Sequence, residues 1–361
     1  MHLGALQMDD GTVSVLIIGG GIAGLATARA LHARGIEARV LERAVSQPAR
    51  GAGVYLPANA VRAIGGLGLS SGLAERAHRI SRQRFLDQRG RVLMEVDLDE
   101  VWGPTGPCLA LPHADLHDVL GAGVPVERGS TITDLDAATA DHGIVVGADG
   151  VRSWVRSAIF PGSGPGFLGQ VSWRLVDDHA AEISAWTVWL GRRATFLAVP
   201  LGGGRTYCYA AVDRRTADDP TGREPSALAD LFGGFAEPVP SLLAGRTEPP
   251  YFSPIEEVVH EPWSRGRVVL VGDAAHAMSP NMAEGVGMAV EDALVLAETV
   301  AAGRPLADFE TRRRPRVEFV QAQTHRRDRT RSLPPFVRDP VLRTAGQRIF
   351  RGNYQALTAA P

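Results

Sequence analysis

The chain has 361 residues, of which 45% are hydrophobic and 22% are charged, and its formal net charge at pH 7 is -2. This length and composition predict one large or two ordinary folded domains, and the near-neutral charge excludes a global attraction to nucleic acid or to an anionic membrane. All 38 basic residues are arginine, which excludes chemistry through a lysine Schiff base or a P-loop lysine.

Cysteine spacing and hydropathy add two expectations. Cys108 and Cys208 stand far apart in the sequence and form no metal-spaced cluster, so we expect no metal site and a reducing, cytoplasmic location. No apolar run reaches the roughly twenty residues of a membrane span, so we expect no membrane association.

The first predicted unit, residues 13–42, has the order of a dinucleotide-binding βαβ segment. An apolar, β-branched run predicts a buried parallel strand, and a G-x-G-x-x-G turn, a helix and a second strand follow it. In that turn Gly19 permits the sharp bend, Gly21 lets backbone approach a pyrophosphate, and Gly24 lets helix and strand pack closely. Glu42 follows the second strand where a carboxylate can accept hydrogen bonds from ribose hydroxyls. The alternative is a structural turn without a ligand.

The next segments are expected to cover this unit and to leave it. Glycines in residues 51–54 indicate backbone that passes close to another group, with a helix around Asn59 above it; an ordinary loop is the alternative. Residues 82–97 alternate with a period of two and predict a β-hairpin. Residues 110–117 predict a short helix carrying His113 and His117, which could bind zinc but more often would be hydrogen-bonded or face solvent.

Two further buried strands are expected, each ending in an acid next to a glycine. Residues 143–148 predict a strand that runs into Asp149-Gly150, and residues 267–271 predict one that runs into Gly272-Asp273, followed by a loop and an apolar-faced helix. Between them, residues 167–247 predict an antiparallel sheet whose aromatic residues form a core or contact a substrate. The arginines after residue 311 indicate a basic partner surface or, more commonly, a solvated helix face.

Three motifs in this order resemble the single-component FAD-dependent aromatic monooxygenases with the p-hydroxybenzoate hydroxylase fold. They are residues 19–24 with Glu42-Arg43, the Asp-Gly motif at 147–153 and the Gly-Asp motif at 272–276. Residues 51–60 and Trp173-Arg174 are most similar to salicylate-hydroxylase-like and urate-hydroxylase-like members.

The resemblance implies an α/β fold in three regions. A discontinuous Rossmann-like FAD-binding domain would comprise residues 12–81, 107–160 and 253–303. A mainly antiparallel β-sheet substrate domain would comprise residues 82–106 and 161–252. C-terminal helices would occupy residues 304–361.

The resemblance also implies roles for particular residues. Glu42 would hold the adenosine ribose, Asp273 the ribityl chain, and Asp149 would steady the pyrophosphate region. The full set implied for FAD is Gly19, Gly21, Ala23, Gly24, Glu42, Arg43, Ala52, Gly53, His113, Asp149, Gly272, Asp273, Gly285, Val286 and Gly287. Candidate catalytic residues are Arg174, Tyr207 and Pro280, and a substrate pocket would include Trp173, Phe196, Tyr209 and Met282.

The implied reaction is a monooxygenation. The protein is expected to be a monomer or a homodimer. NAD(P)H would reduce FAD, O2 would add at the flavin C4a, and the C4a-hydroperoxyflavin would hydroxylate or epoxidise a small aromatic or polyketide-like natural product. Baeyer-Villiger or oxidase chemistry on the same fold is an alternative, and so is an FAD-binding scaffold without turnover. A plain NAD dehydrogenase and a flavin halogenase fit the motifs less well.

Three departures from the family pattern accompany the resemblance. His113 stands where an arginine is usual, and Glu284 stands where a glutamine is common, which would place a carboxylate near the flavin. Residues 133–143 are too few for the hairpin that usually precedes the Asp-Gly strand.

Overall fold

One half of the molecule is built on a six-stranded, mainly parallel sheet. The computed structural model describes residues 14–46, 53–178, 183–217, 225–246, 249–259 and 262–361. The sheet order is β15 (Ser264–Arg265), β16 (Val268–Leu270), β9 (Ile144–Gly147), β1 (Val15–Ile18), β2 (Ala38–Glu42) and β8 (Val126–Arg128). β1 pairs in parallel with β2 and β9, and β16 pairs in parallel with β9. The predicted strands are therefore confirmed, and three of them end side by side.

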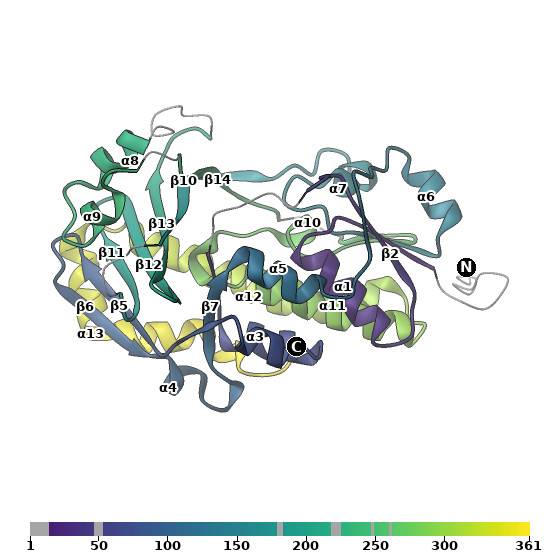
Figure 1. Cartoon of the computed structure of the whole chain (residues 1–361), viewed down its shortest axis with the longest axis horizontal. Helices are drawn as coiled ribbons and strands as arrows, with labels where there is room; N and C mark the ends of the chain where they lie inside the picture. The colour runs from purple at the N-terminus through teal and green to yellow at the C-terminus, as the bar shows by residue number, and fades with distance from the viewer. Residues whose placement is uncertain (1–13, 47–52, 179–182, 218–224, 247–248, 260–261) are drawn as a thin grey trace.

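Helices cover this sheet and position its loops. α1 (Ile22–His32) packs against α11 (Gly285–Ala301) and α5 (His113–Gly121), and α11 also contacts α2 (Ala58–Gly66). The segment that was too short for a hairpin holds α6 (Leu135–Asp141), and α7 (Trp154–Ile159) follows β9. The glycine-rich loops thus begin at strand ends and run directly into helices (Figure 1).

The other half is a seven-stranded sheet drawn from three separate parts of the chain. Its order is β14 (Tyr251–Glu257), β10 (Gly166–Asp177), β13 (Arg205–Asp213), β12 (Ala194–Gly202), β11 (Trp186–Leu190), β5 (Arg82–Asp87) and β6 (Val92–Asp97). All neighbours are antiparallel except β11 and β5, which are parallel. The β5–β6 pair confirms the predicted hairpin, and the antiparallel strands β10 to β13 confirm the sheet predicted for residues 167–247.

The register of this sheet decides which side chains share a face. Arg174 lies opposite Tyr209, and Tyr209 lies opposite Leu197, so these three side chains share one face. Trp173 and Phe196 point to the other face, where they pack in a core with residues of α8 (Pro225–Phe232) and α9 (Val239–Leu243). One face is thus filled by helices, and the other is available for a site.

A three-stranded antiparallel sheet joins the two halves and corrects one prediction. It consists of β3 (Gly53–Leu56), β7 (Cys108–Pro112) and β4 (His78–Ile80). Residues 110–112, expected in a helix, belong to β7, and the helix begins at His113. Proline disfavours helical backbone in the residue before it, which accounts for an extended Leu111. Two short helices precede strands of this sheet in the chain: α3 (Ser70–Ala74) lies between α2 and β4, and α4 (Leu98–Trp102) lies between β6 and β7.

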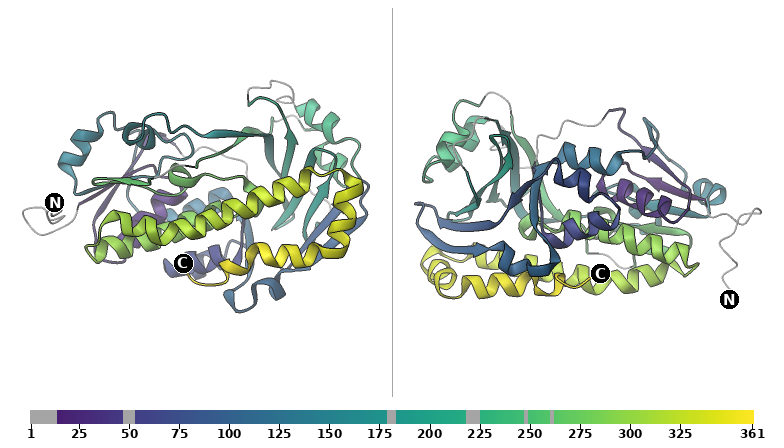
Figure 2. Two further views of the ribbon diagram at one scale, coloured as in Figure 1. Left: turned by 180° about the vertical axis from the view of Figure 1, so that it is seen from behind. Right: turned by 60° about the horizontal axis from the view of Figure 1, so that its bottom comes forward.

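Two long C-terminal helices connect the halves from behind. α12 (Leu306–Ser332) crosses from the six-stranded to the seven-stranded sheet, and α13 (Pro335–Tyr354) turns back alongside it (Figure 2). Short helical turns occur at η1 (Gly103–Thr105), η2 (Pro280–Met282) and η3 (Gln355–Leu357), and α10 (Asp273–His276) replaces part of an expected loop. None of the helices in the described ranges is long and apolar enough to cross a membrane.

Candidate active site

The loops after β1, β9 and β16 meet at one edge of the six-stranded sheet. Backbone hydrogen bonds carry the sheet into these loops: the amides of Gly19, Ala148 and Val271 donate to carbonyls of neighbouring strands at 2.8, 2.8 and 3.0 Å. A cavity of about 660 Å³ opens at this edge and extends to the seven-stranded sheet. Carboxyl ends of parallel strands are the usual ligand sites of such sheets.

The glycines of the first loop have two roles: two of them allow close backbone packing, and one leaves open space in the cavity. A Cβ on Gly24 would lie 1.9 Å from the Gly19 carbonyl oxygen, and Gly19 itself has φ of 114° with Ala148 O at 2.3 Å from its ideal Cβ. Gly21 lines the cavity, and a Cβ there meets nothing within 4 Å. Gly19 and Gly24 thus close the turn. Gly21 leaves room for a phosphate at the N-terminus of α1.

These roles predict opposite effects for two alanine substitutions. Gly24→Ala should lower the free energy of unfolding by about 3 kcal/mol, because the methyl group enters the Gly19 carbonyl. Gly21→Ala should change the free energy of unfolding by less than about 1 kcal/mol but weaken FAD binding at least tenfold. Urea unfolding of flavin-free protein and fluorescence titration with FAD measure the two effects. Wild-type FAD affinity in Gly21→Ala would contradict the assignment.

Two acids of the FAD set hold the loops by accepting backbone hydrogen bonds. Glu42 accepts from the Gly20 and Ala44 amides, both at 2.8 Å. Asp149 accepts from Ser153 Oγ at 2.5 Å and from the first amides of α7 at 2.7 and 3.1 Å, so its carboxylate caps α7. Arg43 is exposed and lies outside the cavity lining, and Ala52 lies outside the described residues.

Arg156 links two of the three loops and was not singled out as a site residue. Its guanidinium donates to Ala274 O at 2.8 Å and to Val151 O at 2.7 Å, and Nε donates to Ser163 O at 2.7 Å. The side chain is buried. A basic residue within the short helix that follows Asp149-Gly150 is the signal that could have identified it.

The start of α11 faces the cavity, whereas the residues behind it are packed. Gly285 and Val286 line the cavity with Asp273, and Gly287 does not; an ideal Cβ at Gly287 would lie 2.9 Å from Glu284 Oε2. Burial raises the pKa of the Asp273 carboxyl, against the lowering effects of His276 and Arg174. Amides at the start of a 17-residue helix supply a partial positive charge to the cavity.

Glu284 is a buried acid that stays neutral near pH 7. It is 1% exposed, and Oε2 accepts from Asn59 Nδ2 at 2.8 Å. Burial raises the pKa of its carboxyl to about 8, although the Asn59 hydrogen bond lowers it. A protonated glutamate has nearly the shape and hydrogen-bonding capacity of glutamine. The departure from the family pattern therefore places no negative charge beside the cavity at neutral pH.

This assignment predicts a pH-dependent stability. The folded pKa of about 8 lies above the reference value of 4.5, so the folded protein holds a proton that the unfolded chain loses across that window. The free energy of unfolding therefore falls as the pH rises from 4.5 to 8. Glu284→Gln removes this contribution, and at pH 9 it should be more stable than wild type by about 3 to 5 kcal/mol, with no difference at pH 4. Urea unfolding across this range tests the prediction; parallel pH profiles would contradict it.

A buried ion-pair network fixes α11 to α12 and to the third loop. Asp292 accepts from the Gly272 amide at 2.9 Å and from Arg313 Nε at 2.8 Å, and lies 2.6 Å from His276 Nε2. Burial raises the pKa of Asp292, but His276 and Arg313 outweigh it and lower the pKa. Glu291 pairs with Arg313 at 2.8 Å and with Arg316 at 2.7 Å. Some arginines of α12 therefore form ion pairs with buried acids, which corrects the prediction that these arginines lie on a solvated helix face.

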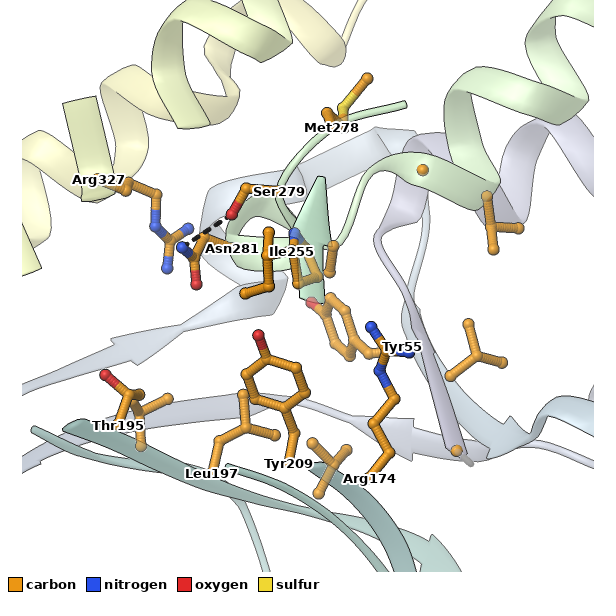
Figure 3. A pocket seen from close by; sticks show the side chains of 18 of the residues that line it. Tyr55, Arg174, Thr195, Leu197, Tyr209, Ile255, Met278, Ser279, Asn281 and Arg327 are labelled. Carbon is orange, nitrogen blue, oxygen red and sulfur yellow. Dashed lines mark hydrogen bonds between the residues drawn. The ribbon is translucent and has the colours of Figure 1, made fainter. Parts of the chain in front are cut away.

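On the opposite side, the cavity is bounded by one face of the seven-stranded sheet. Arg174, Tyr207 and Tyr209 line it, and Figure 3 shows Arg174 and Tyr209 pointing into the space. Arg174 lies 5.8 Å from the Tyr209 ring centroid. Burial raises the pKa of Tyr207, against the lowering effect of the nearby Arg174 guanidinium. Gly53 also lines the cavity and leaves space for Tyr207, whose Cβ is 2.4 Å from an ideal Gly53 Cβ.

Three residues expected in the substrate pocket lie elsewhere. Trp173 and Phe196 are fully buried on the helix-covered face of the sheet, because strand neighbours alternate between faces. Met282 is also fully buried, and its carbonyl accepts from the Tyr354 hydroxyl at 3.2 Å. Pro280, by contrast, does line the cavity.

The two histidines of the predicted helix, His113 and His117, lie in different surroundings. His113 begins α5 and lines the cavity, whereas His117 Nε2 lies 2.9 Å from Gly20 O. Neither belongs to a group of three potential metal ligands in the described part of the chain.

The residues present fit FAD. The open backbone at Gly21 and the N-terminus of α1 suit a phosphate. The N-terminus of α11 suits the pyrimidine edge of a flavin, and the cavity-facing Asp273 suits a ribityl chain.

Comparisons with known proteins agree with this geometry. Residues 12–140 and 136–320 match the FAD binding domain family. The chain is 32% identical to 2-heptyl-3-hydroxy-4(1H)-quinolone synthase of Pseudomonas aeruginosa over 86% of this chain and 88% of that protein. It is 32% identical to 3-amino-4-hydroxybenzoate 2-monooxygenase PtmB3 of Streptomyces platensis over 88% and 87% of the two chains. The fold matches Klebsiella pneumoniae HpxO complexed with FAD and uric acid, with a TM-score of 0.73, 24% identity and coverage of 96% and 92%. The chain therefore belongs to the family of FAD-dependent monooxygenases that share this FAD binding domain.

Proposed function

We propose that the protein uses FAD, NAD(P)H and O2 to hydroxylate or epoxidise a small, electron-rich aromatic molecule bound against Arg174, Tyr207 and Tyr209. The observation that carries the proposal is the continuity of the cavity: one space is lined by Gly21 and Asp273 at the sheet edge and by these three residues on the facing sheet. A substrate there lies directly beside the position that the loops leave for a flavin.

The chemistry that bound FAD would supply is hydride acceptance from NAD(P)H and the activation of O2. The chain's own residues bind and orient the substrate. The guanidinium of Arg174, which lines the cavity near Tyr207 and Tyr209, can stabilise the oxygen of a phenol as it loses its proton. Tyr209 offers a hydroxyl that has no hydrogen-bond partner among the described residues. Trp186, Val188 and Leu197 form apolar walls that exclude water.

The relatives suggest which compounds to try first. By name, similar proteins act as a heptyl-hydroxyquinolone synthase, as 3-amino-4-hydroxybenzoate 2-monooxygenases and as a 3-hydroxybenzoate 6-hydroxylase. We propose hydroxybenzoates, aminohydroxybenzoates and quinolones as the starting panel.

The direct experiment follows NAD(P)H consumption by the yellow protein in air with each compound, with product masses measured in parallel. We expect one compound to accelerate NAD(P)H oxidation and to gain one oxygen atom. A product that has gained oxygen next to a carbonyl would favour Baeyer-Villiger insertion, and acceleration with no product would favour an oxidase. Bound FAD with no acceleration by any compound would favour the scaffold alternative.

A further inference from the structure

Arg327 on α12 is a half-buried guanidinium in the wall of the cavity. It lines the cavity from the side opposite Arg174, beside Asn281, with Tyr209 between them (Figure 3). The ion pairs with Glu291 and Asp292 account for some arginines of this helix but not for Arg327.

The other arginines that line the cavity are each close to a carboxylate. Arg152 pairs with Glu256 at 3.1 Å, Arg331 with Asp213 at 2.8 Å, and Arg338 with Asp339 at 2.9 Å. Arg174 lies near enough to Asp273 to lower the pKa of the Asp273 carboxyl. These charges are balanced before any substrate enters.

Arg327 differs because its contacts are neutral. Its Nη1 donates to the Tyr354 hydroxyl at 2.8 Å and lies 3.6 Å from Met282 Sδ. Its guanidinium carbon lies 5.6 Å and 5.9 Å from the ring centroids of Phe350 and Tyr354. Across the described ranges, no acidic side chain forms an ion pair with Arg327. A partly desolvated cation without a counter-charge is costly unless a ligand supplies one.

We propose that Arg327 is a specificity-determining residue that binds a carboxylate on the substrate, an inference that rests on the proposed function. A guanidinium presents paired N–H donors that match the two oxygens of a carboxylate. The aromatic rings of Phe350 and Tyr354 lie close to the guanidinium, and only its Nη1 forms a hydrogen bond with the described residues, which leaves Nε and Nη2 for a ligand. The substrate class is therefore an aromatic acid, with the carboxylate toward α12 and the reacting ring toward Arg174.

The test compares 3-hydroxybenzoate with its neutral isostere 3-hydroxybenzamide at pH 7.5. Binding is measured from the change in flavin absorbance on titrating the FAD-loaded protein, which does not require turnover. We expect wild type to bind the acid at least tenfold more tightly than the amide. Arg327→Gln should reduce this ratio to near one with little change in amide affinity, and Arg327→Lys should retain at least a threefold preference.

Arg329→Met is the matched control, because Arg329 is an exposed arginine on the same helix outside the cavity lining. It should keep the wild-type ratio. The proposal is overturned if wild type binds the amide as tightly as the acid, if 3-hydroxybenzoate does not bind, or if Arg327→Gln keeps the preference because Arg327 only joins α12 to α13. Selective binding without oxygen transfer would instead contradict the proposed function alone.

Discussion

Replacing Arg313 by methionine is expected to lower the free energy of unfolding by about 3 to 5 kcal/mol, because it leaves two buried acids without their shared counter-charge. Arg313, Glu291 and Asp292 are all fully buried, and Arg313 contacts both carboxylates at 2.8 Å. Asp292 also holds the Gly272 amide. The same substitution should therefore weaken FAD binding by displacing the loop after β16.

Urea unfolding and FAD titration measure both effects, with Arg312→Met as the control. Arg312 is the preceding residue, but its ion pair with Glu298 is 40% and 42% exposed on the two side chains. Exposed pairs contribute at most about 1 kcal/mol. If both variants lose the same small amount of stability, the network does not fix the loop in the way proposed.

Replacing Arg174 by methionine is expected to lower kcat/KM for the aromatic substrate about 100-fold. A charge-assisted hydrogen bond to a phenolate oxygen contributes roughly 1.5 to 3 kcal/mol, and this bond strengthens as the phenol loses its proton. Arg174 is placed for this task between Tyr207, Tyr209 and Asp273. The loss should fall mainly on kcat, and bound FAD should be retained.

Steady-state kinetics across pH separates this role from simple packing. In Arg174→Met the rate should recover as rising pH ionises the free phenol, whereas wild type should show no such dependence. Arg174→Lys should restore part of the rate, since it keeps the positive charge without the planar fork. A uniform loss at every pH in both variants would indicate that Arg174 only supports the sheet.

The FAD side of the site was predictable because its information is local. Gly19, Gly21 and Gly24 stand between a strand and a helix that neighbouring residues specify, and parallel strands place their ends together. The same reasoning predicted Asp149 and Asp273 at the ends of two further strands, which the sheet places next to the first.

The substrate side was less predictable because both faces of its sheet carry large aromatic residues. Trp173 and Arg174 are adjacent, and the sequence does not state which of the two faces is covered by α8 and α9. Large aromatic residues were therefore expected in the pocket, whereas the packing places Trp173 and Phe196 in the core. The partners of the arginines on α12 were also hidden, since Glu291 and Asp292 lie on a separate helix. Two adjacent acids on a mostly apolar helix are the signal that could have indicated buried cations.

The most direct test of the account is oxygen labelling with whichever aromatic compound accelerates NAD(P)H oxidation. The reaction is run under ¹⁸O2 in ordinary water, and in parallel under ordinary O2 in H2¹⁸O. If the cavity positions a substrate beside the flavin as proposed, the product gains one labelled oxygen atom from O2 and none from water. Product oxygen derived from water, or hydrogen peroxide formed in an amount equal to the NAD(P)H consumed, would contradict it.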